Sequence, residues 1–336
     1  GNNNVAFGYE SLLDNTTGTL NTAVGKNSLR SNTTADINTA LGYASLSANT
    51  TGTPNTAVGT NALKSNTTGA TNTAIGCGAL DANTTGGTNT AVGHNSLGAN
   101  TTAGSNTAVG GNTLQANVTG QFNTAVGYDA LLLNTASYNT AVGIDSLRLN
   151  TSGASNTAIG RATLDANTTA SNNTAVGDSA LGANTTGTGT AVGNAALADN
   201  TTGNYNTAVG NGALADNITA DGNLAVGHAA LRNNTTGANN TAVGDSALGA
   251  NTTGTQNVSI GSLSSVTNTT GCYNTAVGHG SLYNNSTGDN NTALGNFALN
   301  DNTTADNNTA VGYFALKANT TGGTNTAMGR LALCKN

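Results

Sequence analysis

The residue types that most often carry chemistry are sparse in this chain, and the best-placed pair is Asp199 and Asp216. The two aspartates are 17 residues apart and occupy the same place in successive copies of a repeat. Stacked copies would bring their carboxylates within about 5–7 Å. Such a pair could bind a cation weakly or act as the acid pair of a polysaccharide-cleaving solenoid. Each aspartate, however, lies in an A-D-N triplet at a position that accepts many residue types. We therefore expect a solvated turn, and no enzymatic activity.

The other candidate ligands for a metal or cofactor are isolated from one another. The three histidines occupy equivalent repeat positions many copies apart, at His94, His228 and His279. No Cys/His spacing of a zinc site occurs. The G-G-x-G-x-D calcium repeat and the glycine motifs that bind phosphate or dinucleotides are also missing from the sequence. The sequence thus predicts neither a metal site nor a cofactor.

Charge and hydropathy exclude further classes of protein. The chain has nine Lys and Arg against 15 Asp and Glu, a net charge of −6, and no basic stripe, which argues against nucleic-acid binding. No apolar run is long enough to insert this segment into a membrane, and there is no signal peptide. The cysteines occupy different repeat positions on distant copies, which predicts free thiols at Cys77, Cys272 and Cys334. The tyrosines are dispersed, so no continuous aromatic track is expected.

Two repeated polar motifs have alternative interpretations. N-T-T and its variants form an N-x-[ST] sequon in most copies, so glycosylation is possible, for example at Asn32 and Asn66. A structural ladder of stacked asparagines explains the same motif without glycans. Columns of threonine suggest ice binding as an alternative function. We expect the N-T-T-G threonines, however, to lie in an outer turn rather than on a flat strand.

All of these residues belong to twenty copies of N-T-A-V-G-x-x-A-L-x-x-N-T-T-G-x-x, numbered here 1 to 17 from the first Asn. Position 5 is Gly from Gly8 to Gly329, at intervals of 17 residues except for two of 16. Position 4 is always apolar, and position 9 is Leu in every copy but the one with Ser265. Both deletions fall in N-T-T-G-x-x, which indicates an outer turn. Positions 6, 7, 10, 11, 16 and 17 accept almost any residue, which indicates that they face water.

This repeat predicts an all-β fold, specifically a parallel β-solenoid of about 17 residues per coil. Asn, Thr and Gly are poor helix formers, and apolar positions 4 and 9 fit no helical stripe. We expect two short strands per coil, roughly T-A-V and A-L-x. Twenty coils at about 4.8 Å each would make a rod on the order of 95 Å long. Residues 1–336 are expected to form one continuous array cut from a longer chain.

Stacking places like residues on like and so predicts the interior. We expect the residues at positions 4 and 9 to form the core: Val24, Leu29, Leu41, Leu46, Val58, Leu63, Ile75, Leu80, Val92 and Leu97. Side-chain amides at position 12 are expected to bond along the axis at the corners. This predicted Asn ladder contains Asn15, Asn32, Asn49, Asn66, Asn83 and Asn100. Few large side chains are buried per 17 ordered residues, which favours further burial by side-by-side association.

The segments Asn21 to Leu29 and Asn55 to Leu63 resemble the N-T-A-V-G repeats of bacteriophage tail fibres and related bacterial surface fibres. More loosely, the repeat is similar to the head repeats of trimeric autotransporter adhesins (YadA-like), which are left-handed β-rolls packed as trimers. This similarity implies a left-handed β-roll for the present chain. The resemblance covers the whole chain and implies a non-catalytic fibre used for attachment. It also implies an extracellular, cell-surface or virion location.

We therefore expect a homotrimeric structural or adhesive fibre shaft or head, whose variable positions contact a host surface, such as a cell-surface glycan or receptor. One rival is an extracellular filament or sheath subunit that stacks end to end. A minor rival is an ice-binding solenoid.

Overall fold

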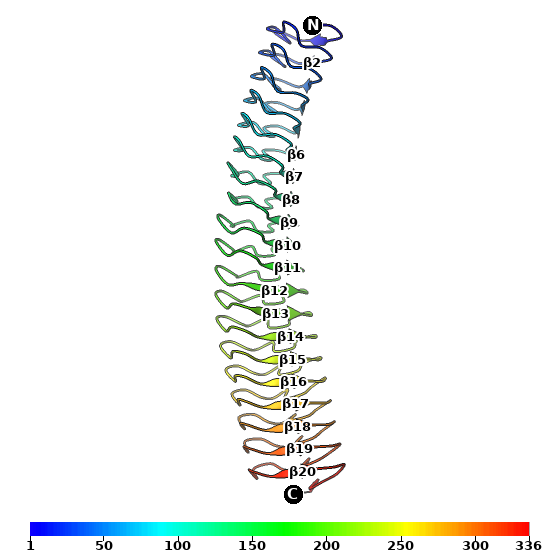
Figure 1. Cartoon of the computed structure of the whole chain (residues 1–336), viewed down its shortest axis with the longest axis vertical. Coiled ribbons are helices and arrows are strands. Elements are labelled where there is room, and N and C mark those ends of the chain that lie inside the picture. Colours follow the sequence, from blue (N-terminus) through cyan, green and yellow to red (C-terminus); the bar gives the residue numbers. More distant parts are fainter. Residues whose placement is uncertain (336) are drawn as a thin grey trace. The chain divides into compact units, whose positions relative to one another are not determined.

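The computed structural model describes residues 1–335 and shows an all-β parallel solenoid with one three- or four-residue strand in each repeat. It comprises two compact units, Gly1–Asn172 with β1 to β10 and Asn173–Asn336 with β11 to β20 (Figure 1). We call each repeat, together with its strand, a rung. Each rung takes the number of its strand, so that rung 4 contains β4. The strands are β1 (Val5–Phe7), β2 (Thr22–Val24), β3 (Thr39–Leu41), β4 (Thr56–Val58), β5 (Thr73–Ile75), β6 (Thr90–Val92), β7 (Thr107–Val109), β8 (Thr124–Val126), β9 (Thr140–Val142), β10 (Thr157–Ile159), β11 (Thr174–Val176), β12 (Gly189–Val192), β13 (Asn206–Val209), β14 (Leu224–Val226), β15 (Thr241–Val243), β16 (Val258–Ile260), β17 (Thr275–Val277), β18 (Thr292–Leu294), β19 (Thr309–Val311) and β20 (Thr326–Met328).

Within each unit, equivalent residues of successive rungs lie on one another, as the repeat predicts. In unit 1, Thr39 of β3 pairs with Thr56 of β4, in parallel. The one-residue deletion before β9 leaves this alignment intact, because Thr124 still pairs with Thr140. The lost residue falls in the turn, so the ladder of strands is unaffected by it.

The second predicted strand, A-L-x, does not form. This half of each rung is a series of turns, and the leucine at position 9 has a left-handed backbone, with φ of 48° at Leu29 and 51° at Leu63. A residue in this region cannot continue an extended strand. Hydrogen bonds to the neighbouring rung persist nevertheless, since the Leu29 amide donates to the Ser45 carbonyl over 3.0 Å.

The glycine at position 5 permits a close approach between rungs. Gly59 has φ of +131°, and a Cβ added to it would lie 2.6 Å from the Gly76 carbonyl oxygen on the next rung. Only glycine fits such a position without strain. The sharp change of direction after each strand therefore depends on this residue.

The interior corrects the prediction for position 4. Side chains alternate across a strand, so a three-residue T-A-V strand turns one side chain inward, and that residue is the alanine at position 3. Ala23, Ala40 and Ala57 are fully buried. The apolar residues of position 4 that were expected in the core instead point outward, half-exposed or exposed: Val24, Leu41, Val58, Ile75 and Val92. The leucines of position 9 are fully buried, as expected: Leu29, Leu46, Leu63, Leu80 and Leu97.

The predicted Asn ladder at position 12 is confirmed, but it lies inside the solenoid rather than at an exposed corner. In unit 1, Asn66 Nδ2 donates to Asn49 Oδ1 over 2.9 Å, and Asn83 Nδ2 donates to Asn66 Oδ1 over 2.8 Å. The same chain of bonds joins Asn15, Asn32, Asn49, Asn66, Asn83 and Asn100. All but Asn15 are fully buried. The expected ladder member Asn336 lies outside the described residues.

A second column of asparagines at position 1 completes the polar interior. The Asn55 amide N–H donates to Asn38 Oδ1 over 2.8 Å, while Asn55 Nδ2 donates to the Gly69 carbonyl over 2.9 Å. Asn66 Nδ2 donates to the same Gly69 carbonyl over 2.9 Å. The turn carbonyls are thus satisfied by two buried amides, which is what a polar group needs when it leaves water.

Candidate interaction surfaces

The outward face of the strands is a uniform surface whose residues are partly or fully exposed. It consists of positions 2 and 4, and we call it the strand face. Position 2 is Thr in seventeen copies and otherwise Val5, Leu224 or Val258, while position 4 is apolar throughout. No charged residue, Gly or Pro occurs at any of these positions. Position 6, which is also exposed, accepts residues as different as Lys26, Ile144 and Asp178. Contact with water alone does not impose such a restriction.

The apolar column of the strand face is well exposed in both units. Leu41 is 47% exposed and Ile75 41%, and in unit 2 Val209 is 38% and Ile260 40% exposed. Fully burying a branched aliphatic side chain removes roughly 60–120 Å² of apolar area from water. The exposed fractions therefore leave about 250–500 Å² on ten rungs from position 4 alone, as large as the largest patch of a typical monomer.

The threonine columns divide into two kinds. At position 13 the hydroxyl is used inside the chain, as when Thr33 Oγ1 donates to the Thr50 carbonyl over 3.1 Å. At position 2 the hydroxyls of residues such as Thr56 and Thr90 make no side-chain hydrogen bond with any described residue. The threonines of position 2 form a column on the strands, where the predicted T-A-V strand places them, whereas the threonines of N-T-T-G lie outside the strands.

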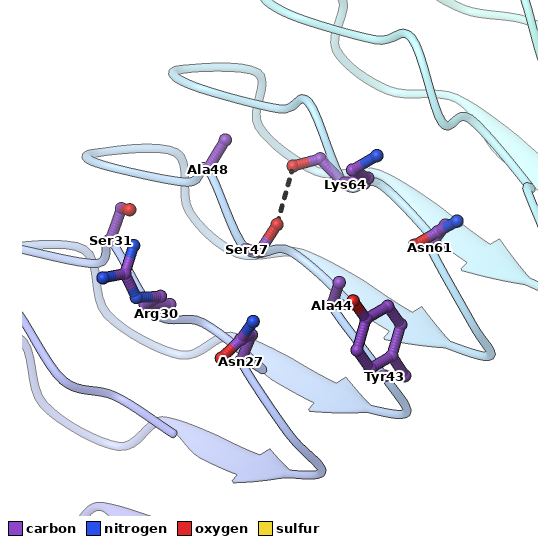
Figure 2. A pocket seen from close by; sticks show the side chains of 9 residues that line it. All are labelled: Asn27, Arg30, Ser31, Tyr43, Ala44, Ser47, Ala48, Asn61 and Lys64. Carbon is purple, nitrogen blue, oxygen red and sulfur yellow. Dashed lines mark hydrogen bonds between the residues drawn. The ribbon is translucent and has the colours of Figure 1, made fainter. Parts of the chain in front are cut away.

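Unlike the uniform strand face, the variable positions carry many residue types, and an open groove lies among them (Figure 2). It lies in unit 1, has a volume of about 480 Å³, and crosses rungs 2 to 4. Arg30 and Lys64 stand on its two outer rungs with Ser47 between them, and Tyr43 lies on the middle rung to one side, beside Ala44. The groove was not predicted, although the variability of its positions correctly indicated exposure.

An aromatic cluster on the same positions in unit 2 was also missed. The ring of Phe297 contacts His279 at 4.9 Å and Phe314 at 5.3 Å between centroids, and Phe314 contacts Tyr313 at 4.1 Å. Lys317 Nζ lies 4.8 Å from the Phe314 centroid. The tyrosines alone look dispersed in the sequence. The cluster forms because Phe297 and Phe314 at position 7 contact His279 and Tyr313 in the neighbouring column of position 6.

Of the remaining candidates for chemistry, Asp199 and Asp216 occupy the same position on the adjacent rungs 12 and 13. Among residues 1–335, no group of three or more His, Cys, Asp or Glu could hold a metal ion. Asp216 lies in a shallow depression with Arg232, and Asp199 is not among the residues that line it. His228 pairs with Asp245 on the next rung, Nδ1 to Oδ1 at 2.9 Å, and both groups are exposed. His94 and His279 lie on distant rungs. Cys77, Cys272 and Cys334 are free thiols.

The two proposed glycosylation sites are corrected by the structure. Asn32 and Asn66 are fully buried, and the Nδ2 atom of each already donates two hydrogen bonds. A glycan on either nitrogen would have no path to the solvent in the folded chain. The ladder accounts for the N-T-T motif instead.

Ion pairs are few and exposed. Arg148 Nε lies 2.9 Å from Asp165 Oδ1, and the pKa of Arg148 is raised by that hydrogen bond and by the charge of the same carboxylate. Arg30 Nε lies 2.8 Å from Glu10 Oε2. Exposed pairs of this kind contribute little to stability. They do hold long side chains in place on the variable face.

Comparisons with known proteins do not identify a family. No family model matches the chain, and a search of curated proteins returned no match. Within residues 1–335, there is no helical segment with the length and hydropathy of a membrane span. Hypotheses about function therefore depend on the two surfaces described above, the strand face and the groove.

Proposed function

We propose that this chain is a structural and adhesive fibre segment, in which copies associate side by side through the strand face, as a homotrimer. The observation that carries the proposal is the absence of any charge, Gly or Pro from the outward strand positions, although these positions are exposed. A surface that excludes charge while its neighbours accept it is typical of the buried part of an interface. An extracellular, cell-surface or virion location follows from the fibre role.

The magnitude of the burial supports association. Position 4 contributes about 250–500 Å² of apolar area per ten rungs, and the methyl groups of the threonine column add to it. A specific interface buries about 800 Å² on each partner. The strand face of one unit therefore supplies about a third to two thirds of this area from position 4 alone, and the threonine methyl groups raise that share. Because the rungs of every copy have the same spacing, the strand-face side chains of one copy can pack beside those of another copy rung by rung.

Sedimentation velocity of the purified chain tests this proposal. We expect trimers at micromolar concentration. The variant Val58→Asp/Val92→Asp/Val126→Asp places three charges on the strand face and should sediment as a monomer with an unchanged circular dichroism spectrum. The control Thr60→Asp/His94→Asp/Tyr128→Asp places the same charges at position 6 of the same rungs and should remain associated. A monomeric native chain, or a strand-face variant that stays trimeric, refutes the proposal.

Ice binding is a second candidate, favoured by the position of the threonine column. Thr56, Thr73 and Thr90 lie on consecutive parallel strands with their hydroxyls unused within the described chain. A regular array of hydroxyl and methyl groups is the kind of surface that can order water into a lattice. Inhibition of ice recrystallisation by the native chain, lost in Thr73→Lys but kept in Cys77→Lys, would support it. Normal recrystallisation at micromolar protein would exclude it.

A further inference from the structure

We propose that the groove across rungs 2 to 4 binds an acidic oligosaccharide, a short run of uronic acid residues lying along the stack between Arg30 and Lys64 and over Tyr43. The inference deepens the proposed attachment role by assigning it a site and a ligand class. The binding itself does not require that copies associate, because all the residues involved lie within unit 1.

The groove exists because the middle rung has short side chains where its neighbours have long ones. On rung 3, positions 7, 10 and 11 are Ala44, Ser47 and Ala48. At position 10 of the flanking rungs stand Arg30 and Lys64. Figure 2 shows the two long side chains on either side of the short ones. Because the side chains of one column stack directly above one another, a single rung of small residues leaves a depression.

The two cations of the groove are presented differently. Arg30 is held by Glu10 on the preceding rung, Nε to Oε2 at 2.8 Å, and its side chain remains 44% exposed. Lys64 makes no ion pair with any residue of the described range 1–335, so its charge is available to a ligand. The two residues stand two rungs apart, which corresponds to about 9–10 Å along the stack. They can therefore contact two separate acidic groups of one extended ligand.

The lining between the cations suits a sugar better than an apolar ligand. Tyr43 is 50% exposed and offers a ring and a hydroxyl group. Ser31 and Ser47 add hydroxyls, and Asn61 adds an amide. Apolar small-molecule sites are more enclosed and are lined mainly by hydrophobic side chains. An aromatic ring with hydroxyls and amides beside it provides both a stacking surface for a sugar ring and hydrogen-bonding partners for its hydroxyl groups.

The charge distribution also limits the ligand to a sparsely charged one. The next residue of the position 10 column is Asp81, which ends the positive stretch after Lys64. A nucleic acid or heavily sulfated chain carries charges much more densely than two cations can neutralise. A uronic acid oligomer carries one carboxylate per sugar and leaves uncharged ring faces for Tyr43. Of the anionic polymers, this class fits the lining best.

Isothermal titration of the native chain with tetragalacturonate at low salt tests the proposal, with cellotetraose as the uncharged comparison. We expect tetragalacturonate to bind at least tenfold more tightly than cellotetraose. Lys64→Gln should weaken it about threefold to fivefold, as for loss of an exposed ion pair, and should reduce the salt dependence. Tyr43→Ala should weaken both sugars about fivefold, as for loss of an aromatic contact.

Matched controls occupy the same repeat positions elsewhere. Lys317→Gln removes a cation at position 10, and Tyr128→Ala removes a tyrosine at position 6; neither should change binding. The inference is overturned if cellotetraose binds as well as tetragalacturonate, if the controls weaken binding as much as the groove variants, or if no heat is measured up to millimolar ligand. Sedimentation of the groove variants should match that of the native chain. Sugar binding by a monomeric protein would therefore refute the trimer while leaving the groove assignment intact.

Discussion

The substitution Asn66→Ala tests how much one member of the buried Asn ladder contributes to stability. Asn66 Nδ2 donates to Asn49 Oδ1 and to the Gly69 carbonyl, each over 2.9 Å, and Asn66 Oδ1 accepts from Asn83 Nδ2 over 2.8 Å. At about 1 kcal/mol net for each bond, the loss is about 3 kcal/mol. The substitution also leaves Asn49 Oδ1 without its donor in a buried site, which adds about 1–2 kcal/mol.

The chain supplies its own control for this prediction, because the ladder is interrupted after Asn100. Asn100 Nδ2 donates to Asn83 Oδ1 over 2.8 Å and to the Ala103 carbonyl over 3.1 Å. Asn100 Oδ1, however, accepts no bond from any described residue, since the next member, Asn117, pairs with Gly120. Asn100→Ala therefore breaks two bonds rather than three, and should cost about 1 kcal/mol less than Asn66→Ala.

Urea unfolding followed by far-ultraviolet circular dichroism gives both free energies by linear extrapolation. Because repeat proteins can unfold in parts, hydrogen exchange of the amides on rungs 3 to 7 should accompany it. We expect the loss of protection to be greatest on the substituted rung and its two neighbours. Equal costs for the two variants, or a larger cost for Asn100→Ala, would show that the axial amide bonds do not determine the stability of the ladder.

Three further substitutions have expected outcomes that urea unfolding can measure. Gly59→Ala should lower the free energy of unfolding by about 2–4 kcal/mol, because of backbone strain and the contact of the new Cβ with Gly76. Gly329→Ala should lower it less, because Gly329 has φ of +119° but no described atom lies within 4 Å of the added Cβ. Equal losses for the two variants would exclude the steric contribution. Leu63→Ile should be at least 1 kcal/mol worse than Leu63→Met, because a branched Cβ is poorly tolerated at φ of 51°; the reverse order would contradict this explanation. Ser265→Leu should raise stability by about 1–2 kcal/mol, since position 9 is buried there too; a lower urea midpoint would show that the rung has no room for leucine.

The sequence was sufficient to predict the stacking of like on like, but not which residues point inward. The repeat length predicts that Thr39 lies against Thr56, and the structure has this pairing. Position 4 was assigned to the core because it is always apolar. A better signal was available in the variation of size: Phe7, Val24 and Met328 all occur there, whereas position 3 is Ala in nineteen copies. A packed column tolerates changes of volume poorly, so the constant small residue was the buried one.

The groove and the aromatic cluster required knowledge of neighbouring columns. Each depends on residues from positions 6, 7, 10 and 11 of several rungs, and their lateral order is set by the turns of the A-L-x half. The sequence predicted a short strand there, roughly A-L-x. The left-handed backbone at Asn27 and Leu29 instead sends the leucine inward and leaves Asn27 beside the groove. Without that backbone geometry, the placement of Tyr43 on the rung between the two cations could not be derived.

The two proposed surfaces follow from one property of the rung. Only six of its 17 positions are regularly buried, namely the two asparagines, the inward alanine, position 8, the leucine and the Gly or Ala of position 15. If copies associate as proposed, the outward strand positions repeat because a partner surface that contacts every rung must find the same residue types on each. If the groove binds a ligand as proposed, its positions vary along the chain because a ligand that covers three rungs restricts only those three. If the strand face contacted nothing, charges should have accumulated at positions 2 and 4 as they have at position 6, where Lys26, Asp178 and Arg330 occur. Their exclusion from all forty outward strand positions is therefore the feature that any rival account of this protein must explain.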